Sequence, residues 1–273
     1  IEAYEEALKH GGEIRERWGE EGLAAIYYSF GRVLHRIDRI DKAEEYYVKA
    51  MELNPKLAIA IGHLAGLYLD IEKYDKALEL ANIYYELVAK TDPYHALSIR
   101  GKALYHTGNY EDALKDFEGL ITYIQQPDAP SYVRTAAPGI YRYMALTYKA
   151  MGNEEKAEGY LNKSLEVATG FIEKGVSLYK LYFERGLTYA ELGEYKKAIE
   201  DFKKSAELSP QFSHGHRFYF VEGWEMAGKM YMKLGDKENA RKCFEKALNV
   251  IRDYEYGLPH IENRIKELLK EVA

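Results

Sequence analysis

The chain has 273 residues, of which 47% are hydrophobic and 30% carry a charge, a composition that excludes a disordered segment and fits a folded protein. Its net charge of −6 argues against general binding to nucleic acid or to membrane surfaces, because both need dense Lys and Arg. The sequence contains no run of 18 apolar residues, so no membrane span is predicted. The single cysteine, Cys243, excludes an internal disulfide and indicates a reducing compartment such as the cytoplasm. Rare Gln beside abundant Glu, Lys and Tyr leans toward a thermophilic source.

The predicted elements are helices, and they repeat. Residues 1–8, IEAYEEAL, have the pattern of the second helix of a helical pair, so we expect another repeat to precede Ile1. Beyond them an alanine recurs every 34 to 44 residues, with an apolar helical stretch and a polar turn before it. An aromatic or apolar residue follows at plus four and often a small residue at plus seven, which together define one face of an α-helix. The marker alanines are Ala43, Ala77, Ala113, Ala157, Ala198 and Ala240.

A small residue on the first helix of each pair lets the second helix approach closely, and we expect it to lie opposite the marker alanine. A larger side chain there would overpack the contact at a cost of ~1–3 kcal/mol, so Gly101→Val should destabilise the protein. The small residues are Gly31, Ala65, Gly101, Ala145, Gly186 and Gly228. Glycines are also predicted to form the turns at Gly108, Gly152, Gly193 and Gly235.

Two predicted loops interrupt the helical repeats, and a last helix is predicted to cover their C-terminal end. Residues 125–139 contain three prolines and are predicted to form a long loop, and residues 209–217 a shorter one. Residues 258–273 place Ile261 and Ile265 on one apolar face, so we expect a helix that caps the last apolar surface. No segment shows a sustained two-residue alternation, and the chain is therefore predicted to be all-α without a sheet.

These residues resemble the motif of the tetratricopeptide repeat family, which has Trp, Leu, Gly and Tyr on the first helix, then Ala, Phe and Ala on the second, then Pro. The last three spacings exceed the usual 34 residues and resemble the long-helix variants of the family. The resemblance implies a right-handed α-solenoid over residues 1–257, with a half-repeat at 1–12, six full repeats, and a C-terminal capping helix at 258–273. The repeat from Val221 shows Trp224, Gly228, Tyr231, Ala240, Phe244 and Ala247, and that from Ala24 shows Tyr27, Gly31, Ala43, Tyr47, Ala50 and Pro55.

Motifs for catalysis or cofactor binding are weak. The stretch GWEMAGKM at 223–230 is a near miss for a phosphate-binding loop, but it lies inside a predicted helix and has Met230 in place of the hydroxyl. His214 and His216 form an isolated pair, which is short of the usual number of metal ligands. Cys243 is predicted to be a buried structural residue. We therefore predict no enzyme activity, no cofactor and no metal site.

The resemblance also implies a binding site. In this family the first helix of each repeat lines an inner groove through its second, fifth, ninth, twelfth and thirteenth positions. Carried onto this sequence, these or adjacent positions are basic and aromatic in the first four repeats and mixed in sign in the last two. Such a lining suits an extended acidic segment or a C-terminal carboxylate, while the alternative is a set of ordinary solvated helix residues. The candidate peptide-binding residues are Tyr28, Arg32, His35, His63, Lys102, Tyr105, His106, Arg142, Tyr143, Lys149 and Phe183.

The function expected from this reading is a non-catalytic scaffold that binds a protein or peptide partner. Chaperone-binding members of the family use an Asn-containing carboxylate clamp, which is absent because the ninth positions contain no Asn. We expect Arg142→Glu to weaken an acidic partner with little effect on stability. Two alternatives stay open: a regulatory domain whose superhelix compacts around a peptide, and an enzyme or enzyme accessory within the solenoid. Self-association through the open ends or exposed aromatics is a further expectation.

Overall fold

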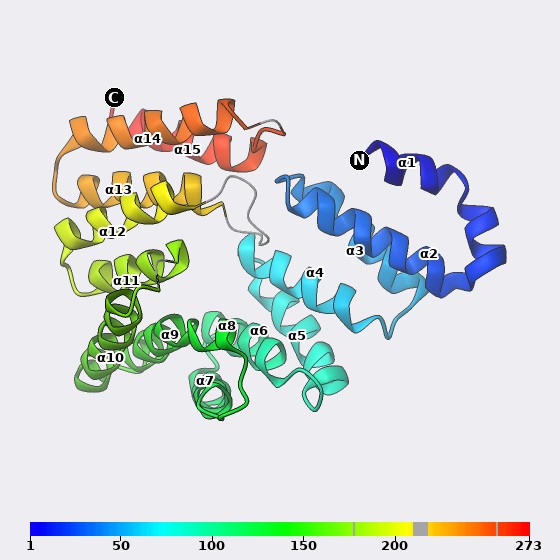
Figure 1. The fold of residues 1–273 in the computed structure, drawn as a ribbon, viewed down its shortest axis with the longest axis horizontal. Helices are drawn as coiled ribbons and strands as arrows, with labels where there is room; N and C mark the ends of the chain where they lie inside the picture. Colours follow the sequence, from blue (N-terminus) through cyan, green and yellow to red (C-terminus); the bar gives the residue numbers. More distant parts are fainter. Residues whose placement is uncertain (177, 210–217, 255) are drawn as a thin grey trace. The chain divides into compact units, whose positions relative to one another are not determined.

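The computed structural model describes residues 1–176, 178–209, 218–254 and 256–273, so the pair His214 and His216 lies outside the described residues. The chain forms two compact units, Ile1–Leu120 and Ile121–Ala273. Both units consist of helices, and no strand occurs in the residues described (Figure 1). The first unit contains α1 (Glu2–Lys9), α2 (Gly11–His35), α3 (Ile40–Leu53), α4 (Ala58–Asp70), α5 (Tyr74–Val88), α6 (Pro93–His106) and most of α7 (Tyr110–Ile124). The second contains α8 (Ser131–Arg134), α9 (Ala137–Ala150), α10 (Glu154–Glu173), α11 (Tyr179–Glu191), α12 (Tyr195–Leu208), α13 (Tyr219–Lys233), α14 (Lys237–Arg252) and α15 (Pro259–Glu271).

Consecutive helices pair as hairpins in both units. In the first unit α2 packs against α3 and α4 against α5, and α6 is joined to α7 by side-chain contacts. In the second unit the pairs are α9 with α10, α11 with α12, and α13 with α14. Within each unit, each hairpin also contacts the next one, as α3 does with α4 and α12 with α13. The predicted all-α fold of tandem helix-turn-helix repeats is therefore confirmed for the part of the chain that the structure describes.

The turns inside the six hairpins share one backbone conformation. Seven residues after each small residue of the first helix, the chain adopts a positive φ, between 58° and 82°. The amide of the following residue then donates to a carbonyl five residues back, as from Asn109 to Leu104 at 2.8 Å and from Asp236 to Tyr231 at 2.9 Å. This is the hydrogen bond that closes a helix with a left-handed residue, a position that favours glycine. The four predicted turn glycines hold this position, and Asp38 and Glu72 hold it in the first two hairpins.

In the four hairpins whose small residue is a glycine, this residue lies against an aromatic ring of the second helix. A Cβ added at Gly101 would lie 2.8 Å from Cε1 of Phe117, and one added at Gly186 would lie 2.9 Å from the ring of Phe202. At Gly31 it would lie 2.9 Å from the ring of Tyr47, while the marker alanine contributes only a backbone oxygen at 3.3 Å. The prediction that the glycine faces the marker alanine is thus corrected. The glycine makes room for the aromatic ring that lies four residues after the marker alanine on the second helix.

A polar contact stands one residue before this glycine in two hairpins, one in each unit. Arg100 on α6 donates to both carboxylate oxygens of Asp116 on α7, at 2.6 and 2.8 Å. Arg185 on α11 donates to both oxygens of Asp201 on α12, at 2.7 and 2.8 Å. Both aspartates are buried, and the two-fold donation fixes the geometry of each pair. In the α2–α3 hairpin the same two positions hold Phe30 and Tyr46, whose rings pack 4.6 Å apart.

Both ends of the chain have helices outside these hairpins. α1 places the ring of Tyr4 on that of Phe30, with centroids 5.4 Å apart. α2 is kinked at Gly19, whose φ of 69° interrupts the helix before the first hairpin begins. At the other end α15 packs against α14, and Ile261 and Ile265 join the apolar cluster of α13 and α14. Among the described helices, none combines the length and apolar character needed to cross a membrane.

We predict that Gly101→Ala lowers the free energy of unfolding by about 1–3 kcal/mol, because the added methyl group overlaps the ring of Phe117. Gly66→Ala is the matched control, since a Cβ at this position on α4 has no neighbour within 4 Å. There the loss of backbone freedom in the unfolded chain should raise stability by about 0.5–1 kcal/mol. Urea unfolding of both variants beside the wild type measures the difference, and equal effects would contradict the packing described.

Candidate peptide-binding surfaces

The predicted site residues lie on the first helices of five hairpins, α2, α4, α6, α9 and α11, and they divide between the units. The first unit holds those on α2, α4 and α6, and α4 contacts both of the other helices. We call this the α2–α4–α6 surface; its predicted members are Tyr28, Arg32, His35, His63, Lys102, Tyr105 and His106. The second unit holds those on α9 and α11, which also contact each other. These are Arg142, Tyr143, Lys149 and Phe183.

On the α2–α4–α6 surface, α2 and α4 are joined by aromatic and imidazole rings. Tyr28 and His63 have ring centroids 5.4 Å apart, and the exposed Arg32 guanidinium lies 5.7 Å from the centre of the Tyr28 ring. His35 is buried and its Nε2 lies 3.6 Å from the Asp70 carboxylate at the end of α4. A residue that sequence analysis left out of the site joins this group from α3. It is Tyr47, whose ring lies 6.0 Å from that of His63.

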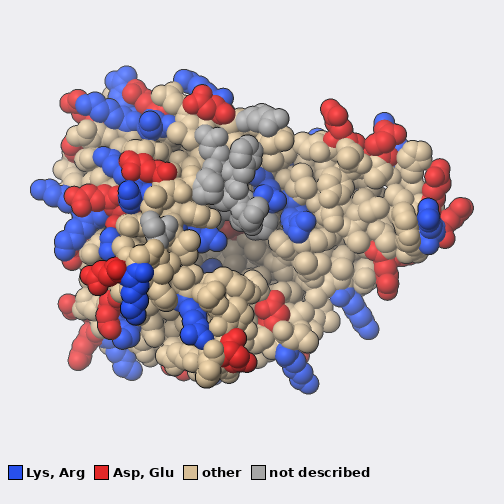
Figure 2. Space-filling model, in the orientation of Figure 1, with Lys and Arg blue, Asp and Glu red and all other residues tan. Residues whose placement is uncertain are grey.

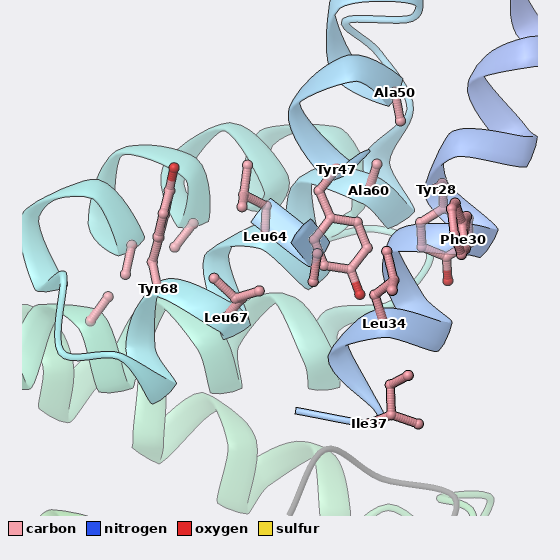
Figure 3. Packing of buried hydrophobic residues seen from close by; sticks show 14 residues of the cluster. Tyr28, Phe30, Leu34, Ile37, Tyr47, Ala50, Ala60, Leu64, Leu67 and Tyr68 are labelled. Atoms are coloured by element: carbon pink, nitrogen blue, oxygen red, sulfur yellow. The ribbon is translucent and has the colours of Figure 1, made fainter. Parts of the chain in front are cut away.

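Tyr47 occupies the centre of the apolar cluster of the first unit. Figure 3 shows its ring between side chains of α2 and those of α4, including Leu34 and Leu64. Its side chain is completely buried, and burial raises the pKa of its hydroxyl well above the ordinary value. The pattern that should have indicated its role is visible in the sequence: three other hairpins have Phe here, namely Phe117, Phe202 and Phe244.

His63 is neutral at physiological pH. Burial lowers its pKa to about 4, and the nearby basic groups of His35, Arg32 and His95 add to this effect. A neutral imidazole donates one hydrogen bond without carrying a charge. Basic groups from α2, α4 and α6 are therefore close enough to influence one another.

The α6 part of the surface is more open. His106 is exposed at the edge of its ring but stacks flat on Tyr74 of α5, with centroids 4.2 Å apart, and partial burial lowers its pKa. Tyr105 meets the same imidazole edge-on at 4.9 Å. Lys102 is half-buried. Packing thus holds the two rings in fixed positions on α6.

In the second unit the predicted basic residues are bound to acidic residues of the next hairpin. Arg142 is only 8% exposed, and its Nε and Nη2 both donate to Glu184 Oε2 on α11 at 3.2 Å. Lys149 lies 3.5 Å from Glu191, also on α11. Tyr143 lies beside Arg142, with the guanidinium 5.0 Å from its ring centre. The expectation that Arg142 is a solvated residue with little effect on stability is therefore corrected. Its ion pair with Glu184 joins the α9–α10 hairpin to the α11–α12 hairpin.

Phe183 is a core residue rather than a surface one. It is 1% exposed, and its ring packs against Phe202 at 5.3 Å and Tyr219 at 5.0 Å. The position that the family pattern assigns to the groove is here filled by an aromatic side chain that faces the neighbouring helices. It is removed from the candidate site for that reason.

The last hairpin shows the same neutralisation. Glu225 on α13 is 2% exposed, and it accepts hydrogen bonds from Arg264 on α15 at 2.7 and 3.0 Å and from Lys229 at 2.7 Å. Burial alone would raise the pKa of Glu225, but these cations outweigh it and hold the pKa below its ordinary value. On the face drawn in Figure 2, acidic and basic side chains are interspersed over the helices of the second unit. Among the described residues, no group of three or more His, Cys, Asp or Glu side chains is arranged to hold a metal ion.

The stacked hairpins define a helical-repeat protein. Models of the tetratricopeptide repeat match residues 24–57, 64–130, 144–169, 179–212 and 221–254, which together are most of the chain. The chain belongs to the tetratricopeptide repeat family.

Curated relatives are distant and diverse. The human protein O-mannosyl-transferase TMTC1 is 24% identical over 246 residues, which is 88% of this chain and 25% of that protein. The Hsp70-Hsp90 organizing protein 3 of Arabidopsis thaliana is 23% identical over 253 residues, 84% of this chain and 41% of that protein. The response regulator aspartate phosphatase E of Bacillus subtilis is 23% identical over 255 residues, 89% of this chain and 65% of that protein. The chain thus spans less than half of the first two relatives, and the three names differ too much to select a function.

Solved structures show the fold alone. A tetratricopeptide repeat protein from Parabacteroides merdae has a TM-score of 0.59 at 20% identity, with 100% of this chain and 99% of that chain covered. The Cut9–Hcn1 hetero-tetramer of the APC/C has a TM-score of 0.52 at 13% identity, with 98% of this chain and 46% of that chain covered.

We predict that Arg142→Glu lowers the free energy of unfolding by about 2 kcal/mol or more, because it buries a second carboxylate beside Glu184. Glu184→Arg alone should be destabilising as well, and the double exchange should recover much of the loss. Chemical unfolding of the three variants forms a double-mutant cycle. Additive losses in the double variant would show that the pair does not hold α9 to α11.

We predict that stability falls as the pH is lowered from 6.5 toward 4. The unfolded chain takes up a proton on His63 near pH 6.5, whereas the folded chain resists it down to about pH 4. Since one pKa unit corresponds to about 1.4 kcal/mol, the loss approaches ~3 kcal/mol at the lower end. Urea unfolding at pH 7 and pH 5 measures the effect above the titration range of the carboxylates. His63→Gln should have a flatter dependence, and an unchanged slope would assign the loss to other groups.

Proposed function

We propose that this protein is a non-catalytic interaction scaffold that binds an acidic, extended or helical segment of a partner protein on the α2–α4–α6 surface. The observation that carries the proposal is the contrast between the units. Arg142 and Lys149 in the second unit are paired with Glu184 and Glu191. In the first unit Arg32 is exposed and has no ion pair with any described carboxylate.

The surroundings of Arg32 support a ligand-binding role. The Tyr28 ring holds the guanidinium in place through a cation–π contact, which orients it at little cost in side-chain entropy. Arginine pairs with carboxylates in a fixed geometry, and neighbouring aromatic rings contribute desolvated contact area. Family membership supports the same conclusion, because the relatives named for organising Hsp70 and Hsp90 are protein-interaction scaffolds. Location in the cytoplasm is part of the proposal.

The test uses the full chain and a fluorescein-labelled peptide of ten glutamates, acetylated and amidated at its ends. We expect binding in fluorescence anisotropy that weakens as the salt concentration rises, because exposed charges are screened. Arg32→Glu should weaken it about tenfold or more, the effect of losing a charge-assisted hydrogen bond. Lys149→Glu is the matched control, being an equal change of charge in the second unit. Equal losses in the two variants would show only an effect of net charge and would refute the assignment to the first unit.

A further inference from the structure

In the first unit, two buried hydroxyl groups have no hydrogen-bond partner among the described residues apart from the Arg32 guanidinium, which interacts with one of them, that of Tyr28. They are those of Tyr28 on α2 and Tyr47 on α3, and both oxygens are shut off from solvent. Most buried polar groups in proteins are satisfied, and an unsatisfied one costs about 1–3 kcal/mol. The hairpin itself does not need the hydroxyl of Tyr47, since Phe fills the same position in three other hairpins.

The two tyrosines belong to one group of polar side chains. Their ring centroids are 6.2 Å apart, and His63 of α4 lies beside both, at 5.4 Å from Tyr28 and 6.0 Å from Tyr47. Arg32 covers the Tyr28 ring from the exposed side, and its charge opposes the rise in the pKa of both hydroxyls caused by burial. Two phenol groups, an imidazole and a guanidinium therefore converge at the junction of α2, α3 and α4, all within the first unit.

We propose that this junction is the anchor of the acidic segment: it takes up one glutamate side chain, whose carboxylate pairs with Arg32 and accepts hydrogen bonds from Tyr28, Tyr47 and His63. The inference rests on the proposed function and narrows it to one ligand group. Binding moves the Arg32 guanidinium off the Tyr28 ring, which uncovers the hydroxyls. The carboxylate then meets the hydrogen-bonding need that the free protein leaves open.

The chemistry of the junction selects a singly charged acceptor. Every group there can donate a hydrogen bond, and a carboxylate accepts up to about four without donating any. Arg32 supplies one full positive charge, whereas His63 is neutral, so a doubly charged phosphate would be left with excess negative charge. A glutamate side chain is slender enough to follow the space that Arg32 vacates. The further basic groups along α6, such as Lys102, favour an acidic segment over a lone chain terminus.

Occupation of the junction should change the protonation of His63. The groups that face it are Tyr28, Arg32 and His35 from α2, Tyr47 from α3 and His95 from α6. The acidic groups of this region act elsewhere: Asp70 lies beside His35, while Asp92 binds His95 and adds to the rise that burial causes in the pKa of Tyr84 on α5. A carboxylate placed against His63 would favour the protonated imidazole, so its pKa should rise on binding.

The decisive experiment compares Tyr47→Phe and Tyr28→Phe with the wild type in thermal melts and in binding of the ten-glutamate amide. We expect the melting temperature of each variant to stay the same or rise, because an unsatisfied hydroxyl is removed, while binding weakens about tenfold. Tyr46→Phe is the matched control. Tyr46 directly precedes Tyr47 on α3, and its ring packs on Phe30 instead. The NMR titration of His63 should show a higher pKa with the peptide present.

The outcomes separate the two proposals. Arg32-dependent binding that is unaffected by Tyr28→Phe and Tyr47→Phe overturns the anchor and leaves the proposed function standing. No binding of the ten-glutamate amide to the wild type overturns both. A lower melting temperature with intact binding assigns the hydroxyls to folding and also refutes the anchor. A ten-glutamine peptide with a free carboxyl terminus should not bind, and if it binds as tightly, the occupant is a chain terminus rather than a side chain.

Discussion

The contact between a glycine on the first helix and an aromatic ring on the second determines how closely the helices of a hairpin approach. It occurs as Gly31 with Tyr47, Gly101 with Phe117, Gly186 with Phe202 and Gly228 with Phe244. The ring occupies the volume that any side chain at the glycine would need, so the two residues are fixed as a pair. The turn seven residues later and the apolar faces on either side then follow in register. The packing of these four hairpins is built around this contact, whereas the other two hairpins have Ala65 and Ala145 at the position of the glycine.

The residues next to this contact distinguish one hairpin from another. The residues directly before the glycine and before the ring also form a pair across the hairpin. This pair is Arg with Asp in α6–α7 and α11–α12, and Phe with Tyr in α2–α3. Between hairpins, α9 and α11 of the second unit are joined by ion pairs, whereas in the first unit α2 and α4 are joined by rings and a histidine. This difference explains why basic side chains of similar position are neutralised in one unit and remain exposed in the other at Arg32.

The repeat pattern of the sequence was sufficient to predict the hairpins, their turns and the small residues, because each depends on residues close together in the chain. The N-terminal helices were predicted less well, since the kink at Gly19 leaves no periodic signal. The binding surface was predicted only in part. The burial of Phe183 and the pairing of Arg142 depend on residues of the next hairpin, and position within a repeat does not reveal them. The Arg and Asp of the recurring pair were visible beside the aligned Gly and Phe, but their contact was not inferred.

The helix pairs in close contact are never more than two elements apart along the described parts of the chain. Such local contacts require little loop closure before they form, so folding of proteins of this kind is fast for their length. During synthesis the α2–α3 hairpin can close as soon as Leu53 has left the ribosome, without waiting for any later segment. Within each unit, each new hairpin then finds its docking surface already formed by the one before it, which shortens the exposure of apolar faces.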